Sequence, residues 1–324
     1  MCPMDYQLPK MKRQQKMKKT FLLSNGLEIP AVGMGTYPLG GQVLSEAVHD
    51  AWCCGYRLFD TADNYYNEED LGRSLGALYG STDAKREELF LVSKLSDELY
   101  RPGTLGGGRN KGLYFWKNSP AMQGEDAVRR VVRQKIGHTL SALRTDYLDL
   151  LLMHWPYPDY FGEIWREMED LYREGLVRAI GVCNCRERHF EKLRKGGCAV
   201  FPMVNQFESS PLNTKQALAD YCKANGIHVM VYSPLMNLRL KAPAAYGGCL
   251  AGLAGKYRKT KAQIILRFDV QRGFTPIPKS AHRERLHSNI DIFDFELTDG
   301  EMERLSGFNE DRQTLPESKS CPGL

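Results

Sequence analysis

Four polar residues stand at or just beyond the ends of predicted β-strands, and their types suit proton transfer to or from an oxygen atom. Asp60 lies at the end of one predicted strand, and Tyr65 follows it by five positions. Lys94 ends the next predicted strand, and His154 ends the one after that. Each residue has an ordinary alternative role, such as a helix-capping aspartate or a structural histidine. Their concentration at the ends of three consecutive strand–helix units favours one shared site.

The chemistry that this set supports is the reduction of a carbonyl group. A free phenol has a pKa near 10, which makes tyrosine a weak acid at neutral pH. An ammonium at Lys94 would stabilise the phenolate of Tyr65 and lower that pKa, while Asp60 would hold Lys94 charged and oriented. His154 would donate a hydrogen bond to the carbonyl oxygen. The four side chains would then polarise a carbonyl group that accepts hydride from a nicotinamide.

Apolar strand-like runs and amphipathic helix-like runs alternate along the chain, and this alternation predicts how the four residues are positioned. The predicted strands are Val32–Thr36, Arg57–Thr61, Leu89–Lys94, Leu148–His154, Ala179–Cys183, Met203–Gln206, His228–Tyr232 and Thr275–Pro278. The predicted helices are Val43–Cys54, Glu69–Leu78, Ala127–Leu143, Glu163–Glu174, Glu187–Lys195, Lys215–Asn225 and Lys261–Arg272. Eight strand–helix units favour a parallel α/β sheet closed into a (β/α)8 TIM barrel, whose active sites lie at the C-terminal ends of the strands.

Turn residues refine this architecture. Asn25-Gly26 in the segment Leu22–Ile29 predicts an N-terminal β-hairpin before the first barrel strand. Glycines after helix-like runs predict left-handed helix ends, at Gly55, Gly175, Gly226 and Gly273. The alternative fold is a doubly wound dinucleotide-binding sheet. It is disfavoured because no G-x-G-x-x-G opens a helix after the first strand.

Length and composition agree with one large barrel. The chain has 324 residues, of which 42% are hydrophobic and 26% charged, with a net charge of +5. We assign residues 20–324 to a single barrel domain and residues 1–19 to a basic, disordered N-terminal extension. Six cations cluster in the extension, at Lys10, Lys12, Arg13, Lys16, Lys18 and Lys19. Binding of nucleic acid or anionic lipid by this cluster is the alternative to a solvated segment.

One interval between predicted strands is too long for a single helix. Lys94 and Leu148 are 54 positions apart, and a helix accounts for only part of that distance. The excess, residues 97–124, is a long insertion after the third strand that contains Gly106–Gly108 and four aromatic residues. Loops of this length are usually functional or disordered. We expect the insertion to cover the substrate side of the barrel, with a mobile surface loop or a subunit contact as the alternatives.

Cysteine usage and hydropathy exclude several other classes of protein. The nine cysteines show no C-x-x-C spacing, which predicts free thiols in a reducing cytoplasm and no metal site. Cys183 and Cys185 could form a metal or redox pair, but ordinary thiols are the favoured interpretation. No apolar run approaches the ~18–20 residues that span a bilayer, and none has the length of a signal-peptide core.

Three ordered segments resemble the signatures of the aldo-keto reductases. They are Gly55–Gly72, Met168–Asn184 and Ile277–Asn289, and the resemblance extends from about Thr20 to Asn309. Asp60, Tyr65, Lys94 and His154 resemble the catalytic tetrad of this family. The resemblance implies a (β/α)8 barrel that reduces aldehydes or ketones to alcohols, reversibly and with NADPH, with Tyr65 as the general acid.

The resemblance also implies a binding site for NADPH or NADP+. Asn184 and Gln206 should bond the nicotinamide carboxamide, and Tyr232 should stack on the ring. Lys279 and Arg285 resemble the family's clamp on the 2′-phosphate, and two cations on one phosphomonoester are physically sensible. The remaining cofactor-binding residues that we predict are Gly35, Thr36, Asp60, Cys183, Ser233 and Leu235 (the last two along the pyrophosphate), Ser280 beside the phosphate, and Asn289 near the adenine.

The chain departs from the family pattern at three positions. Cys183 replaces a serine beside the carboxamide, Ser288 replaces a glutamate near the adenine, and Ser96 replaces a tryptophan of the substrate wall. We expect aromatic residues to rebuild that wall, and the predicted substrate-binding residues are Tyr37, Trp155 and Trp116. Short segments at Trp155–Gly162, at Met236–Gly248 and after Phe308 predict a fairly open site.

Two other functions compete with carbonyl reduction. An NADPH-binding sensor or regulatory barrel with little turnover is the alternative, and the intact tetrad argues against it. A metal-dependent barrel hydrolase lacks paired histidine ligands at strand ends. We therefore expect a cytoplasmic enzyme, a monomer or weak homo-oligomer, that takes a small carbonyl substrate and has no nucleic-acid or membrane partner.

Overall fold

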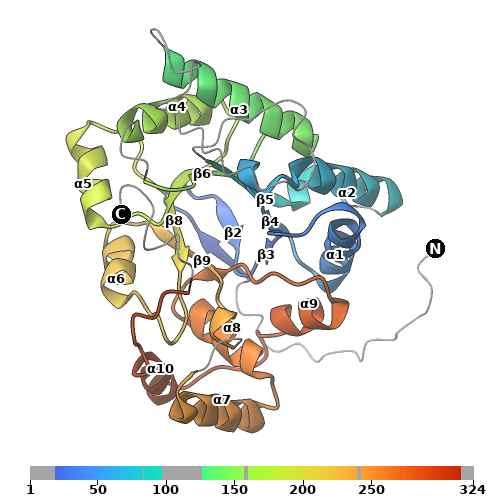
Figure 1. Cartoon of the computed structure of the whole chain (residues 1–324), viewed down its shortest axis with the longest axis vertical. Coiled ribbons are helices and arrows are strands. Elements are labelled where there is room, and N and C mark those ends of the chain that lie inside the picture. The colour runs from blue at the N-terminus through green and yellow to red at the C-terminus, as the bar shows by residue number, and fades with distance from the viewer. Residues whose placement is uncertain (1–18, 83, 97–125, 157–159, 239–241, 315–324) are drawn as a thin grey trace.

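Parallel strands surrounded by helices make up the computed structural model, which describes residues 19–82, 84–96, 126–156, 160–238 and 242–314 (Figure 1). The described residues contain eight parallel strands in one curled sheet. They are β3 (Met34–Gly35), β4 (Leu58–Asp60), β5 (Phe90–Leu95), β6 (Leu150–Met153), β7 (Ile180–Cys183), β8 (Val204–Glu208), β9 (His228–Tyr232) and β10 (Thr275–Pro276). Each corresponds to a predicted strand, so the predicted strand order is confirmed.

Backbone hydrogen bonds between the first and last strands close this sheet. The ladder runs in chain order from β3 to β10. Gly33 N–H donates to the carbonyl of Pro276 (3.0 Å), and Gly35 N–H donates to that of Pro278 (3.3 Å). A Cβ on Gly35 would lie 2.9 Å from the carbonyl oxygen of Ile277, so only glycine permits this approach. The predicted (β/α)8 barrel is therefore confirmed.

Helices cover the outside of the barrel (Figure 1). Seven of them correspond to predicted helices: α1 (Gly41–Cys54), α2 (Glu68–Ser81), α3 (Ala127–Leu143), α4 (Phe161–Arg173), α5 (Glu187–Lys195), α6 (Gln216–Ala224) and α8 (Lys261–Gln271). The glycines predicted to end helices all have positive φ, among them Gly55 at 101°. The helices α7 (Ala244–Tyr257), α9 (Arg283–Ile290) and α10 (Asp299–Ser306) are additional to the prediction.

The helix α7 corrects the expectation that Met236–Gly248 is a loop, since Ala244–Gly248 form its beginning. Four of its fourteen residues are glycine, which has a low helix propensity and hides the pattern. Packing overrides this propensity, because Tyr246, Leu250 and Leu253 are buried against α8 and α10 in a separate hydrophobic cluster.

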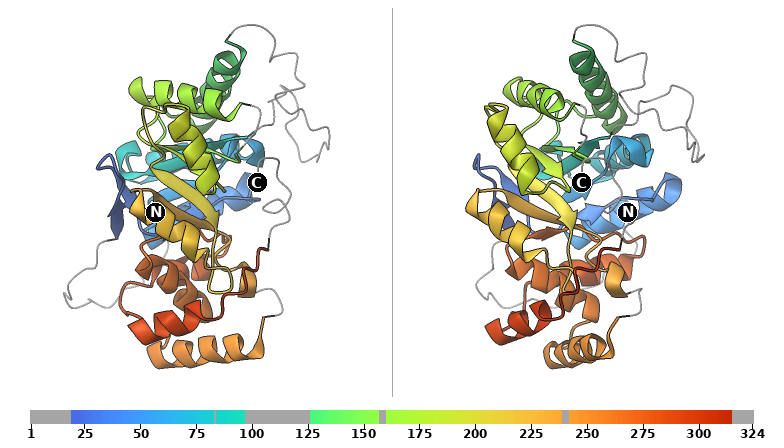
Figure 2. Two further views of the ribbon diagram at one scale, coloured as in Figure 1. Left: turned by 90° about the vertical axis from the view of Figure 1, so that its left-hand side faces the viewer. Right: turned by 60° about the vertical axis from the view of Figure 1, so that its left-hand side comes forward.

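The predicted hairpin is also confirmed. Strands β1 (Thr20–Leu22) and β2 (Glu28–Pro30) pair antiparallel, and Gly26 has a φ of 82° in the turn. Asn25 Nδ2 donates to the carbonyl of Arg178, which precedes β7, so the hairpin lies at the N-terminal end of the barrel (Figure 2). The opposite end, where the strands finish, holds the four predicted catalytic residues.

Several predictions fall outside the described residues. They include the insertion at 97–124 with Trp116, the extension except its last residue, and residues 157–159 of the loop after His154. Within the described ranges, no helix has both the length and the apolar character needed to cross a membrane.

Candidate active site

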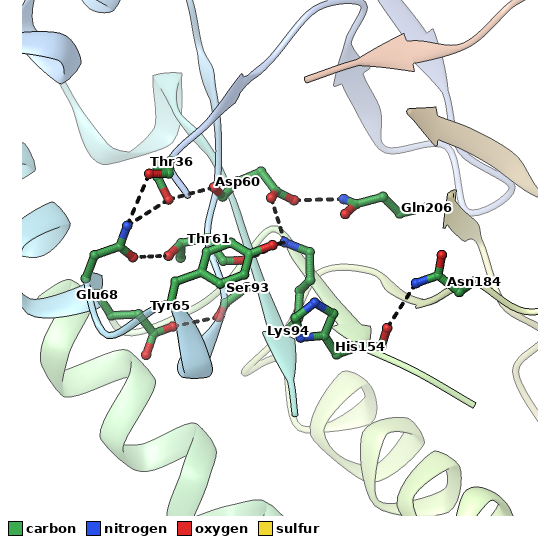
Figure 3. A network of polar contacts seen from close by, with 11 residues as sticks. Thr36, Asp60, Thr61, Tyr65, Glu68, Ser93, Lys94, His154, Asn184 and Gln206 are labelled. Atoms are coloured by element: carbon green, nitrogen blue, oxygen red, sulfur yellow. Dashed lines mark hydrogen bonds and ion pairs between the residues drawn. The ribbon is translucent and has the colours of Figure 1, made fainter. Parts of the chain in front are cut away.

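The four predicted residues meet at the C-terminal ends of β4, β5 and β6 (Figure 3). Lys94 Nζ lies 2.6 Å from Asp60 Oδ1 and 3.2 Å from the phenolic oxygen of Tyr65. The rings of Tyr65 and His154 meet edge to face, with their centroids 5.8 Å apart. An ammonium therefore bridges a carboxylate and a phenol, beside an imidazole.

Strand geometry explains why Asp60 and Lys94 face each other. The parallel register pairs Asp60 with Val92, so Lys94 lies two residues further along its strand, with its side chain toward the same interior. Lys94 is 1% exposed, and Nζ also donates to the carbonyl of Thr61 at 2.7 Å. All three protons of the ammonium thus have an acceptor, as burial of a charge requires. Tyr65 comes from the short 3-10 turn Asp63–Tyr65 that follows β4.

Asp60 has a second partner that no sequence pattern predicts. Gln206, on β8, donates from Nε2 to Asp60 Oδ2 at 2.8 Å. Each oxygen of the carboxylate is thereby fixed, one by Lys94 and one by Gln206. The Gln206 contact spans 146 positions and follows only from closure of the barrel.

The surroundings keep Lys94 charged. Burial acts to lower the pKa of its ammonium, but Asp60 and then Tyr65 raise it, and the net change is upward. The ammonium in turn acts on Tyr65 in the predicted direction, lowering the pKa of the phenol. Burial has the larger effect, however, and raises the pKa of Tyr65 to about 12. The phenol therefore keeps its proton at neutral pH, and the expectation of a net downward shift is corrected.

His154 is a neutral imidazole in this site. Burial, followed by the charges of Lys94 and Lys135, lowers the pKa of His154 well below its usual value. Its Nδ1 is buried and has no hydrogen-bond partner among the described residues. A neutral ring retains one N–H donor, which is what a carbonyl oxygen requires.

Three of the predicted cofactor residues form an amide-rich wall beside the tetrad. The hydroxyl of Tyr232 donates to Asn184 Oδ1 at 2.8 Å, while Asn184 Nδ2 lies 3.5 Å from the carbonyl of His154. The side-chain nitrogen of Gln206 donates to Asp60, which leaves the side-chain oxygen of Gln206 as an acceptor. The oxygen of Gln206 and the nitrogen of Asn184 are complementary to the amino and carbonyl groups of a carboxamide. The wall therefore fits a nicotinamide carboxamide.

The predicted phosphate residues Lys279, Ser280 and Arg285 lie at or just before the start of α9, whereas Asn289, predicted near the adenine, lies in its last turn. Lys279 and Arg285 are exposed, Ser280 and Asn289 are buried, and Ser280 Oγ accepts from the backbone N–H of His282 at 3.0 Å. The N-terminus of a helix with two cations nearby is suited to bind a phosphate. Ser233 and Leu235 follow β9, on the side of the barrel next to β10.

Two further predicted cofactor residues have structural partners. Gly35 lies where β3 closes on the segment after β10. Thr36 is fully buried, and its hydroxyl donates to the backbone carbonyl of Asp60 at 3.0 Å. Thr36 thus fixes the end of β3 against the end of β4, where Asp60 stands.

Aromatic rings flank the phenol on the substrate side. Tyr37 is 58% exposed, and its ring centroid lies 4.9 Å from that of Tyr65. Trp155 stacks on His154 at 6.1 Å. Ser96 is buried, and its hydroxyl has no partner in the described part of the chain. Tyr37 and Trp155 therefore each contact a ring of the tetrad.

The two cysteines of the Cys183-x-Cys185 segment are buried free thiols. Burial is the largest influence on each thiol, and it raises the pKa of both. Neither is a thiolate at neutral pH, so ordinary packed thiols describe them better than a redox pair.

A second polar cluster lies behind the tetrad and is absent from the sequence prediction. Asp63 and Lys135 form a buried ion pair. Glu68 accepts from the hydroxyl of Ser93 at 2.6 Å (Figure 3). It also accepts from the hydroxyl of Thr139 at 3.0 Å, and burial raises its pKa to about 7. One signal in the sequence points to the cluster, since Lys135 interrupts the apolar face of α3.

Comparisons with known proteins extend these observations. A sequence model of the aldo/keto reductase family matches residues 31–310. A glyoxal reductase of Bacillus subtilis is 37% identical over 301 residues, which cover 93% of this chain and 96% of that protein. A methylglyoxal reductase of Escherichia coli O157:H7 is 32% identical over 311 residues, which cover 93% and 97%. The solved structure of a Bombyx mori aldo-keto reductase in complex with NADP has a TM-score of 0.78 and 31% identity, with 94% and 97% covered.

Proposed function

The chain belongs to the aldo/keto reductase family, and we propose that it reduces aldehydes or ketones to alcohols with NADPH, using Tyr65 as the general acid. One observation carries the proposal: the ammonium of Lys94 lies between Asp60 and the oxygen of Tyr65. A phenol that only fills space needs no buried ammonium beside it, because burying that charge is costly.

Tyr65 donates the proton in this proposal. Its phenol is protonated at neutral pH, since burial raises its pKa to about 12. As negative charge develops on the substrate oxygen, the phenol transfers its proton, and Lys94 stabilises the phenolate that remains. His154, as a neutral donor, holds the carbonyl oxygen toward the phenol. Asp60 keeps Lys94 charged and in place.

NADPH fits the remaining residues. A bound nicotinamide supplies the hydride. Asn184 and Gln206 would hold the carboxamide, Tyr232 would pack against the ring, and Lys279 with Arg285 would hold the 2′-phosphate. The complementary amide atoms of the first pair and the cations at the start of α9 support this assignment.

Small dicarbonyl compounds are the substrates that we propose first. Glyoxal reductase and methylglyoxal reductase are the names of two relatives that cover almost all of the chain.

The alternative is a barrel that binds NADPH as a sensor with little turnover. Oxidation of NADPH, followed by its absorbance, separates the two. We expect turnover with glyoxal, methylglyoxal and simple aldehydes, faster with NADPH than with NADH. Tight binding of NADPH without turnover on any carbonyl would favour the sensor, and failure to bind NADPH would contradict both.

A further inference from the structure

The turn that carries Tyr65 is attached to the strand that carries Lys94 at two points. One is the contact between Lys94 Nζ and the phenolic oxygen (3.2 Å). The other is a backbone contact, in which the N–H of Ser96 donates to both carboxylate oxygens of Asp63, at 3.1 and 3.2 Å. Asp63 precedes Tyr65 by two positions, and Ser96 follows Lys94 by two. The carboxylate of Asp63 therefore fixes the turn against the end of β5.

Lys135 on α3 neutralises that carboxylate. Its Nζ lies 2.7 Å from Asp63 Oδ2, and the two side chains are only 5% and 10% exposed. Apolar residues flank Lys135 on the buried face of α3, among them Val131, Val132 and Ile136. Burying a lysine costs free energy of desolvation, which the attraction of a carboxylate partner offsets. Removal of either member of the pair would leave the other as an uncompensated buried charge.

One turn further along α3, Thr139 holds the other end of the same segment. Its hydroxyl donates to Glu68 Oε2 at 3.0 Å, and Ser93, next to Lys94, donates to Glu68 Oε1 at 2.6 Å. Asp63 and Glu68 lie on either side of Tyr65 in the sequence. The segment that carries the phenol is thus held at both ends by α3 and β5.

We propose that Asp63 and Lys135 are a positioning pair that sets the distance between the phenol of Tyr65 and the ammonium of Lys94 during carbonyl reduction. Neither residue touches the substrate. The inference rests on the proposed function. It concerns kcat, because a displacement of about 1 Å in a reacting group can cost ~10²-fold in rate. The residues proposed to bind the carboxamide and the phosphate of NADPH come from the segments between β7 and α9 rather than from β4, β5 or α3, so NADPH affinity should change little.

Three variants test the pair. Lys135→Met removes one charge, and Asp63→Asn/Lys135→Met removes both, so that no buried charge is left alone. Arg133→Met is the matched control, since Arg133 lies on the same helix and pairs with Glu174 at 2.6 Å on the exposed surface. The measurements are kcat and KM for methylglyoxal, the dissociation constant of NADPH, and the melting temperature.

We expect kcat to fall about 10- to 100-fold in Lys135→Met and in the double variant, with an NADPH dissociation constant within about twofold of wild type. Arg133→Met should match wild type. If Lys135→Met fails to fold, the kcat of the double variant tests the proposal. A folded double variant with wild-type kcat would overturn the pair's role while leaving the proposed function intact. A folded wild-type protein that binds NADPH but reduces no carbonyl would overturn the proposed function, and this inference with it.

Discussion

Gln206 donates a hydrogen bond of 2.8 Å to Asp60, across the interior of the barrel from β8 to β4. Asp60 uses its other oxygen to hold Lys94 at 2.6 Å. The residue proposed to bind the carboxamide and the residue that holds the ammonium of Lys94 are therefore in direct contact. A substitution of Gln206 should therefore alter how Asp60 holds Lys94, and through Lys94 it should affect the proposed proton donor Tyr65.

Gln206→Met tests this connection. The substitution keeps the side chain's length and removes both the proposed carboxamide acceptor and the bond to Asp60. A hydrogen bond to a charged group contributes ~1.5–3 kcal/mol, so loss of the bond to Asp60 should lower kcat about tenfold or more. A bond to the neutral carboxamide contributes ~0.5–1.5 kcal/mol, so NADPH affinity should fall about two- to tenfold. Equilibrium titration and steady-state kinetics measure the two quantities separately. A loss confined to affinity, with kcat unchanged, would show that Gln206 does not act through Asp60.

The two directions of the reaction should depend differently on pH. Reduction needs a protonated phenol and a neutral imidazole. Burial raises the pKa of Tyr65 to about 12, and burial with Lys94 and Lys135 lowers the pKa of His154 far below neutrality. Neither group should therefore change its protonation state near neutral pH, so neither should add a pH dependence to kcat for reduction there. Alcohol oxidation needs the phenolate, whose small fraction grows about tenfold per pH unit below the pKa. An oxidation rate that falls as the pH rises would contradict this account of Tyr65.

Cofactor preference should reside at the start of α9. Lys279→Met and Arg285→Met each remove a charge from the proposed 2′-phosphate site, and each should weaken NADPH binding about tenfold or more, at ~1.5–3 kcal/mol per charge-assisted bond. NADH binding should not change, because NADH has no 2′-phosphate. Arg283→Met is the control, since this exposed arginine lies on the same helix and contacts Asp50 at 3.7 Å. Equal losses for NADPH and NADH would refute the assignment.

Asp269 should limit stability at alkaline pH. Both oxygens of its buried carboxyl group lack a partner among the described residues, and burial, opposed by Arg272, raises its pKa to about 8. A pKa raised above the unfolded value of about 4 means that stability is lost as the pH rises from 4 through 8. Asp269→Asn should therefore raise the free energy of unfolding by about 1–3 kcal/mol at pH 8 and by less at pH 5. Asp146→Asn, at an exposed position, should have little effect on denaturant unfolding at either pH. A gain that is independent of pH would contradict the assigned pKa.

The barrel is predictable from the sequence because strands and helices have different hydrophobic periods, and the candidate site is predictable because its residues stand at strand ends. Asp60, Lys94 and His154 can be placed together for this reason from sequence alone. The helix α7 cannot, since its glycines carry no helix signal and only packing of Tyr246 and Leu250 favours it.

Interactions between distant segments lie beyond the sequence pattern. The contact of Gln206 with Asp60 depends on barrel closure, and the net pKa of Tyr65 depends on how deeply the phenol is buried. Lys135 is recognisable in the sequence as a cation within an apolar helix face. Its partner Asp63 is not, because the whole insertion separates the two residues in the sequence. Such a partner is found only in three dimensions.

The most direct test of the central claim is the rate of NADPH oxidation by methylglyoxal in wild type and in Tyr65→Phe. The substitution removes only the phenolic oxygen that Lys94 contacts at 3.2 Å. General acid catalysis contributes about 10²–10⁴-fold. We therefore expect kcat to fall at least ~10²-fold, while the NADPH dissociation constant stays within about twofold of the wild-type value. A Tyr65→Phe protein that turns over at the wild-type rate would contradict Tyr65 as the proton donor.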